Sequence, residues 1–278
     1  MGHHYVPQFY LRGFSVNNTI WVHDRVEKRT FGSQPKTVAN ETNMYTEEIE
    51  QHLANAVEDP AKPAIEKIRE RKRLTEDERQ ALANYVIALW KRVPEGRTRV
   101  AERMPEVAAE VRSNLHDELT AAAAADPRLV ALAESRKEQV NRIIATYESD
   151  PPPDIWQQSL GKDSSARVVD SLLSMEWRFL YSDREQFVAC DNPVFFFAHE
   201  GIGRPTSELS IPFSSSVALW ASRRSGGKPL YMQAAPAAVR ELNRRSASNA
   251  TRFLYSERNE PWILPFVCKK QYSLNRLS

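Results

Sequence analysis

The run His3-His4-Tyr5-Val6-Pro7-Gln8-Phe9-Tyr10-Leu11-Arg12-Gly13-Phe14 decides how this chain folds. It mixes polar and ionisable side chains with large apolar ones before any helix signal appears. A chain terminus is ordinarily loose and polar. We therefore expect this run to be buried against the rest of the protein and to place its polar side chains at a site.

The same run carries a resemblance to a known family. HHYVPQFYLRGF resembles the opening signature of the domain of unknown function 4238 family, whose members are uncharacterised. In that family a glutamine tends to lie near the position of Trp90, before the arginine matched by Arg92, and this chain lacks it. The resemblance implies a shared fold and no settled activity, so the chemistry is argued from the residues. Further similar segments are Thr19 to Arg25, Val38 to Thr46, Cys190 to Val194 and Leu242 to Ser256.

Downstream of the run, the hydrophobic period changes from strand to helix. Ile20-Trp21-Val22 predicts a strand, with a turn at 26–29 and a return strand ending near Gly32. Thr46 can cap a helix, and Thr75 with Glu78 forms a capping box. Long amphipathic patterns then continue to about residue 149.

Beyond the proline-rich stretch 150–154, strand patterns return. Residues 177–181 and 186–190 predict a β-hairpin, and 194–197, 209–213, 217–221, 230–233 and 252–255 predict further strands. Pro236 opens a helix, and Ile263-Leu264 is interpreted as a last strand. The expected fold class is α+β: an antiparallel sheet formed by N- and C-terminal segments, with an inserted helical bundle. The expected parts are 1–45, 46–150 and 151–278, forming one composite domain.

Composition narrows the class of protein. The chain has 278 residues, 41% hydrophobic and 27% charged, which are ordinary globular values. No apolar run approaches the roughly 20 residues of a membrane helix, and no signal peptide opens the chain. The two cysteines, Cys190 and Cys268, form no CxxC pair, so a zinc ribbon is excluded. We expect a cytoplasmic protein without a membrane partner; the sequence does not specify an oligomeric state.

The C-terminal fifth is basic. Residues 223–278 hold eleven Lys and Arg against three Glu, which gives 11 − 3 = +8, whereas the whole chain carries +2. Such a region suits a nucleic acid or another polyanion as partner. The alternative is a solvated face without a partner.

His3 and His4 are the first candidate catalytic residues. Neighbouring side chains of an extended chain point to opposite faces, so we expect one histidine to face a site and the other to bond locally. Neutral imidazole can act as a general acid or base, or bind a metal. The alternative is a hydrogen-bonded pair that anchors the N-terminus.

Gln8 and Arg12 are the first candidate substrate-binding residues. If the chain turns helical after Pro7, the two lie four apart on one face. Arg12 could then bind a phosphate or carboxylate. Equally, it could pair internally, for example with Asp191.

Asp191 and Asn192 precede Pro193 at a strand end. Asp191 is the third candidate catalytic residue and a candidate ligand for a divalent metal such as magnesium or manganese. Asn192 is a candidate substrate-binding residue. The alternative is an aspartate turn that satisfies backbone amides.

Asn243 is the last candidate substrate-binding residue, on a predicted helix with Arg240, Arg244 and Arg245. These arginines could neutralise phosphates, or form a solvated helix face.

The usual Rossmann, P-loop, zincin and α/β-hydrolase motifs are absent. The leading hypothesis is a nuclease-like phosphodiester hydrolase with a His/Asp/Arg site. The alternatives are a non-catalytic binding module for an anionic ligand or partner protein, and an N-terminal run that only closes the fold.

Overall fold

The computed structural model describes residues 2–149, 152, 154–161, 166–197, 201–223, 226–227 and 229–277. Most of the proline-rich stretch that we expected to be a boundary, namely residues 150, 151 and 153, lies outside them. The chain forms two compact units. One contains residues 1–95 and 160–278, and the other contains 96–159.

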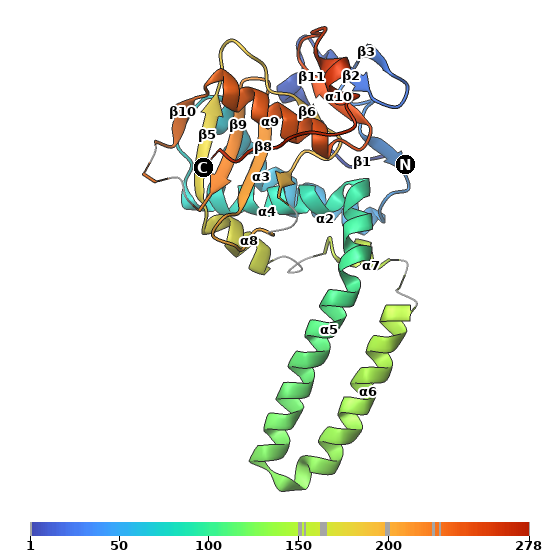
Figure 1. Cartoon of the computed structure of the whole chain (residues 1–278). Coiled ribbons are helices and arrows are strands. Elements are labelled where there is room, and N and C mark those ends of the chain that lie inside the picture. Colours follow the sequence, from blue (N-terminus) through green and yellow to red (C-terminus); the bar gives the residue numbers. More distant parts are fainter. Residues whose placement is uncertain are drawn as a thin grey trace. The chain divides into compact units, whose positions relative to one another are not determined.

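A four-stranded sheet joins the two ends of the chain in the larger unit. Strand β2 from the N-terminal part pairs antiparallel with β11 from the C-terminal part, with Val22 opposite Tyr255 (Figure 1). This pairing confirms the α+β class with a sheet built from both ends. The strand order is β3 (Arg29–Ser33), β2 (Ile20–Asp24), β11 (Phe253–Ser256) and β6 (Ala189–Cys190).

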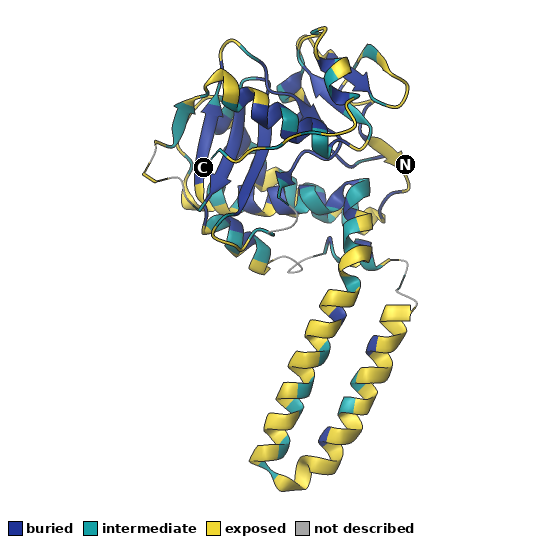
Figure 2. Cartoon of the chain, in the orientation of Figure 1, coloured by how far each residue is buried: buried dark blue, intermediate teal, exposed yellow. Residues whose placement is uncertain are grey.

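A five-stranded sheet forms the rest of the larger unit's β structure. All its pairings are antiparallel except β10 with β5. Every residue of β8 and β9 is buried, because both faces of the sheet are covered (Figure 2). The strand order is β10 (Tyr231–Gln233), β5 (Glu176–Tyr181), β9 (Val217–Ser222), β8 (Glu208–Ser214) and β7 (Phe195–Phe196).

The predicted hairpin of residues 177–181 and 186–190 is wrong. β5 pairs with β9 and β10, whereas β6 pairs with β11 in the other sheet. After the turn at 182–185, the Phe187 amide donates to the Ser215 carbonyl and the Val188 amide to the Asn243 side chain. The chain therefore leaves β5 and crosses to the second sheet instead of returning along β5.

Two helices of the larger unit begin at the predicted capping residues. Thr46 accepts a bond from the Ile49 amide, and Thr75 with Glu78 forms the full capping box. Ile263-Leu264 lies in a helix rather than a strand, because a short apolar run does not distinguish the two. The helices are α2 (Glu47–His52), the π-helical η2 (Leu53–Glu58), α3 (Asp59–Arg69), α4 (Glu76–Arg92), α8 (Ala166–Leu173), α9 (Pro236–Asn249) and α10 (Ile263–Val267).

The smaller unit is helical. Two long helices run antiparallel and are joined by a short turn in which Asp126 accepts a bond from the Arg128 amide (Figure 1). The elements are α5 (Pro94–Ala125), which starts just before this unit, η3 (Pro127–Leu129), α6 (Val130–Ser149) and α7 (Ile155–Gln158).

The N-terminal run packs on the five-stranded sheet, as expected. The Tyr10 hydroxyl donates to the Pro212 carbonyl at 2.6 Å, and the Ser215 amide donates to the Gly13 carbonyl at 2.9 Å. Gly13 is required at this contact, because a Cβ there would lie 2.5 Å from the Phe213 carbonyl oxygen. The run forms β1 (Gly2–His4), paired with β4 (Asn40–Thr42), then α1 (Gln8–Leu11) and η1 (Arg12–Phe14).

Candidate functional site

A polar pocket of about 420 Å³ lies beside the N-terminal run. Its walls come from that run, from the continuous helical stretch of α2, η2 and α3, and from the end of α4. Three of the predicted site residues line it together. The lining residues are His4, Pro7, Gln8, Phe9, Arg12, Glu50, Glu58, Lys62, Ile65, Glu66, Arg69 and Arg92.

His4 is held at the end of β1 by two bonds. Its imidazole Nε2 donates to the Lys36 carbonyl at 3.0 Å, and its own carbonyl accepts from Arg92 at 2.6 Å. When the ring is neutral, Nδ1 is therefore the nitrogen free to accept a proton. The backbone bonds fix where this imidazole stands relative to the pocket.

Arg92 is the buried cation of the site, with 2% of its side chain exposed. It pairs with Glu58, and Glu50 lies 4.0 Å away. Burial alone would lower the pKa of Arg92, but its interactions with Tyr45 and with the Glu58 carboxylate outweigh burial and raise that pKa. Arg92 therefore stays charged and ties the N-terminal strand to α4.

Two atoms beside this cluster lack hydrogen-bond partners. Among the described residues, Glu50 Oε2 and Arg92 Nε are buried and accept or donate no hydrogen bond. Buried polar atoms are normally satisfied by protein, water or a bound molecule. Glu50 Oε2 therefore keeps an unused acceptor position next to the Arg92 guanidinium, 4.0 Å away.

Gln8 and Arg12 line the pocket from the N-terminal run. The chain turns helical after Pro7, which caps α1 with extended backbone angles. Arg12 is exposed, and within the described part of the chain neither its guanidinium nor the Gln8 amide bonds to another side chain. Both are thus free to bind a ligand.

Arg69 anchors the helical turn that carries Gln8 and Arg12. Its guanidinium donates to the carbonyls of Phe9, Tyr10 and Phe213, each at 3.1 Å. Burial lowers the pKa of Arg69. This arginine therefore holds the motif in place and has few donors left for a ligand.

His3 is buried away from this pocket. Its Nδ1 accepts a bond from the Tyr45 amide at 3.1 Å, and its ring stacks on Tyr45 with centroids 5.6 Å apart. His3 and His4 thus have separate surroundings, as their adjacency in an extended strand predicts.

Asp191 does not line the pocket either. Its carboxylate accepts the amides of Thr251, Arg252 and Phe253 at 2.8, 2.7 and 2.9 Å. Burial raises the pKa of Asp191 to about 6, and these three backbone bonds oppose that rise. Burial raises the pKa of Tyr5, and the charge of Asp191 raises it further.

The surroundings of Asp191 do not favour a cation. Its oxygens face backbone amides, which present positive charge to it. Across the residues that the structure describes, no group of three or more His, Cys, Asp or Glu side chains is arranged to hold a metal ion.

Asn192 and Asn243 both bridge backbone segments. The Asn192 side chain donates to the Asn249 carbonyl at 3.1 Å. The Asn243 side chain accepts the Val188 amide and donates to the Gln186 carbonyl, both at 3.0 Å. Each asparagine therefore joins α9 to the strand region around β6.

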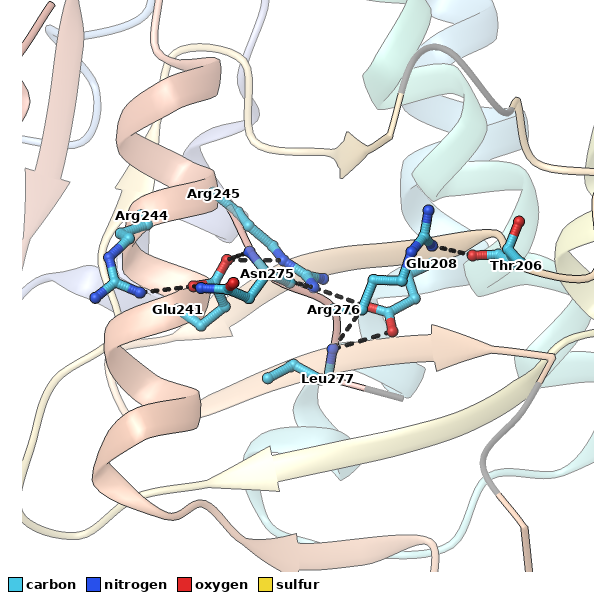
Figure 3. Close-up of polar contacts among 8 residues, drawn as sticks. All are labelled: Thr206, Glu208, Glu241, Arg244, Arg245, Asn275, Arg276 and Leu277. Carbon is cyan, nitrogen blue, oxygen red and sulfur yellow. Dashed lines mark hydrogen bonds and ion pairs between the residues drawn. The ribbon is translucent and has the colours of Figure 1, made fainter. Parts of the chain in front are cut away.

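The arginines of α9 are largely paired (Figure 3). Arg245 is fully buried and lies 2.6 Å from Glu208 and 3.8 Å from Glu241. Arg244 pairs with Glu241 at 2.7 Å, and Glu241 also accepts the Asn275 amide. These charged groups hold the C-terminal segment against the sheet. Part of the net charge of +8 that residues 223–278 carry is therefore not available at the surface.

Arg92 and the acidic residues of the pocket were not predicted as site residues from the sequence. Glu58, Lys62 and Glu66 recur every four residues, which predicts one helix face and could have signalled a charged wall. The π-helical segment Leu53–Glu58 joins α2 to α3 at this wall, and such segments are frequent at functional sites.

Together, the fold and the pocket define an α+β protein with a charged pocket built around its N-terminal run. The chain belongs to the family described as protein of unknown function (DUF4238), whose sequence profile matches residues 2–260. No curated protein and no solved structure matches the chain. Within the described residues, no helix is long and apolar enough to cross a membrane.

Proposed function

We propose that this protein binds a small ligand carrying a phosphate or carboxylate group in the pocket beside its N-terminal run. The observation that supports the proposal is that one pocket is lined by Glu50, Gln8 and the exposed Arg12, whose guanidinium bonds to no other side chain among the described residues. Arg12 and Gln8 would hold the anionic group. Glu50 would accept a hydrogen bond from a hydroxyl or amine of the same ligand.

The balance of charge in the pocket fits such a ligand. Arg69 donates to backbone carbonyls, and Arg92 is paired with Glu58. Lys62 pairs with Asp59 at 2.6 Å. Arg12 is thus the cation with most freedom to meet an anion, and a single charge-assisted contact contributes about 1.5–3 kcal/mol.

A screen by thermal unfolding tests the proposal. The probes are inorganic phosphate, AMP, citrate and a short DNA oligonucleotide. A ligand at about 100 times its Kd stabilises by about 2.7 kcal/mol, which raises Tm measurably. We expect at least one probe to raise Tm for wild type and not for Arg12→Gln, whereas the exposed control Arg73→Gln responds like wild type. If no probe raises Tm, or Arg12→Gln responds fully, the proposal fails.

Hydrolysis of a phosphodiester at the same pocket is the second candidate function. The position of His4 favours this function. Its Nε2 is bonded to the Lys36 carbonyl, so its Nδ1 could act as the general base that takes a proton from water. Arg12 would then stabilise the charge on the phosphate. The contacts of Asp191 support no role for it in this scheme.

Cleavage assays distinguish this candidate from binding alone. DNA and RNA are incubated with the protein in magnesium, in manganese and in chelator. We expect His4→Ala to abolish any cleavage and His116→Ala, in the separate helical unit, to leave it intact. Absence of cleavage by wild type leaves the binding function only. We propose that the protein acts in the cytoplasm, because its two cysteines are too few for the disulfide framework of a small secreted domain.

A further inference from the structure

The helical unit of residues 96–159 buries little of its apolar surface. Along the described residues of its two long helices, the buried positions are Gly96, Ala108, Ala133 and Ile144. Figure 2 shows both helices exposed over most of their length. Arg112 and Glu148 pair across them at 2.6 Å. Two helices that pack only on each other hide one narrow stripe each, so other apolar residues beside Ala108 and Ile144 remain exposed.

These apolar residues line a groove of about 260 Å³ between α5 and α6. Every residue that lines it is apolar or aromatic. Scattered exposed apolar residues are normal, but a continuous apolar patch marks an interaction surface. Five lining residues are between 37% and 50% exposed: Val107, Val111, Leu115, Ile143 and Tyr147.

We propose that a second copy of this chain covers the groove, so that two hairpins form a four-helix bundle. The exposed part of these five residues amounts to roughly 60–100 Å² each, or about 400 Å² per copy. Two copies would bury about 800 Å² from these residues alone. The polar flanks of four facing helices bring the total into the range of about 1,200–2,000 Å² that stable interfaces bury.

The apolar pattern of α5 matches itself in the antiparallel direction. A two-fold axis between residues 109 and 110 sets Ala108 opposite Val111 of the other copy, and Met104 opposite Leu115. The same register sets Val100 opposite Leu119. A closed dimer requires such a self-complementary surface.

The charges of α5 favour the same arrangement. Residues 97–103 hold three arginines and one glutamate, which gives 3 − 1 = +2. Residues 113–119 hold Asp117 and Glu118 with no Lys or Arg, which gives −2. Antiparallel pairing brings the basic part of one copy beside the acidic part of the other.

A lipid surface fits the groove less well than a second copy. Residues 96–149 hold eight Lys and Arg against nine Asp and Glu, which gives 8 − 9 = −1. Helices that lie on membranes carry a polar face rich in Lys and Arg. Mixed charge around an apolar seam is instead the pattern of a helical bundle.

Sedimentation equilibrium of the full chain over a wide concentration range tests the proposal. The monomer mass is 31.8 kDa, and we expect twice that mass at high concentration. Val111→Glu should raise the dimer Kd by more than about 100-fold, because it buries a charge in the seam. The control Ser113→Glu, half a turn away on α5, should leave the dimer intact.

A charge exchange tests the register. Arg103→Glu should weaken the dimer, and adding Asp117→Arg should restore it. Circular dichroism verifies that each variant keeps its helices, and Val107→Ser replaces Val111→Glu if that variant unfolds. A monomer at every concentration overturns the proposal, and so does a dimer that responds equally to the seam variant and to Ser113→Glu.

Discussion

Replacing Asp191 by alanine tests whether this carboxylate holds the fold. The substitution removes the acceptor for the amides of Thr251, Arg252 and Phe253. A donor left unsatisfied inside a protein costs about 1–3 kcal/mol, and Thr251 is exposed enough to recover a bond to water. Two amides, those of Arg252 and Phe253, then stay unsatisfied, so we expect Asp191→Ala to lower the free energy of unfolding by about 2–6 kcal/mol, a large share of the total stability of a typical domain.

Urea unfolding followed by circular dichroism measures this loss. The matched control is Asp183→Ala, which removes an exposed carboxylate paired with Arg71 and should change stability by less than about 1 kcal/mol. An Asp191→Ala variant as stable as the control would refute the structural role. Loss of stability together with unchanged ligand binding at the N-terminal pocket would separate the two regions, as the geometry predicts.

Two further predictions concern the core around the N-terminal run. His23 is buried between the Thr30 and Ser256 hydroxyls, and burial lowers its pKa from 6.5 to about 4. As pH falls, the unfolded chain binds a proton at His23 before the folded protein does. The stability that neutral His23 contributes is therefore lost between about pH 6.5 and about pH 4, by roughly 3 kcal/mol. The difference in unfolding free energy between wild type and His23→Gln, measured across that pH range, isolates this loss; a difference that does not change with pH contradicts it. Gly13→Ala places a methyl group 2.5 Å from the Phe213 carbonyl oxygen, so unfolding should become easier by about 1–3 kcal/mol; an unchanged Tm would show that the backbone yields there without strain.

Local signals in the sequence predicted the elements that depend on nearby residues. The capping box of Thr75 and Glu78 starts α4, and the turn after Pro7 sets Gln8 and Arg12 on one wall. Such features follow from the caps and backbone angles of a few residues. The sequence therefore predicted the lining residues of the pocket that belong to the N-terminal run, but not those from the helices α2 to α4.

Features that depend on distant partners could not be predicted in this way. The stretch 177–190 has a good local turn, yet β5 and β6 belong to different sheets, because their pairing partners come from β9 and β11. Arg92 reaches His4 across 88 residues of chain. No local pattern marks such a contact, so the acidic and basic core of the pocket was missed.

The central claim is that Arg12 holds an anion in the pocket beside the N-terminal run. Isothermal titration of AMP, or of whichever probe raises Tm most, into wild type, Arg12→Gln and Arg73→Gln tests it most directly. The geometry predicts that Arg12→Gln weakens binding at least about tenfold, since a charge-assisted bond contributes 1.5 kcal/mol or more, while Arg73→Gln binds like wild type. Equal affinity in all three proteins would contradict the claim.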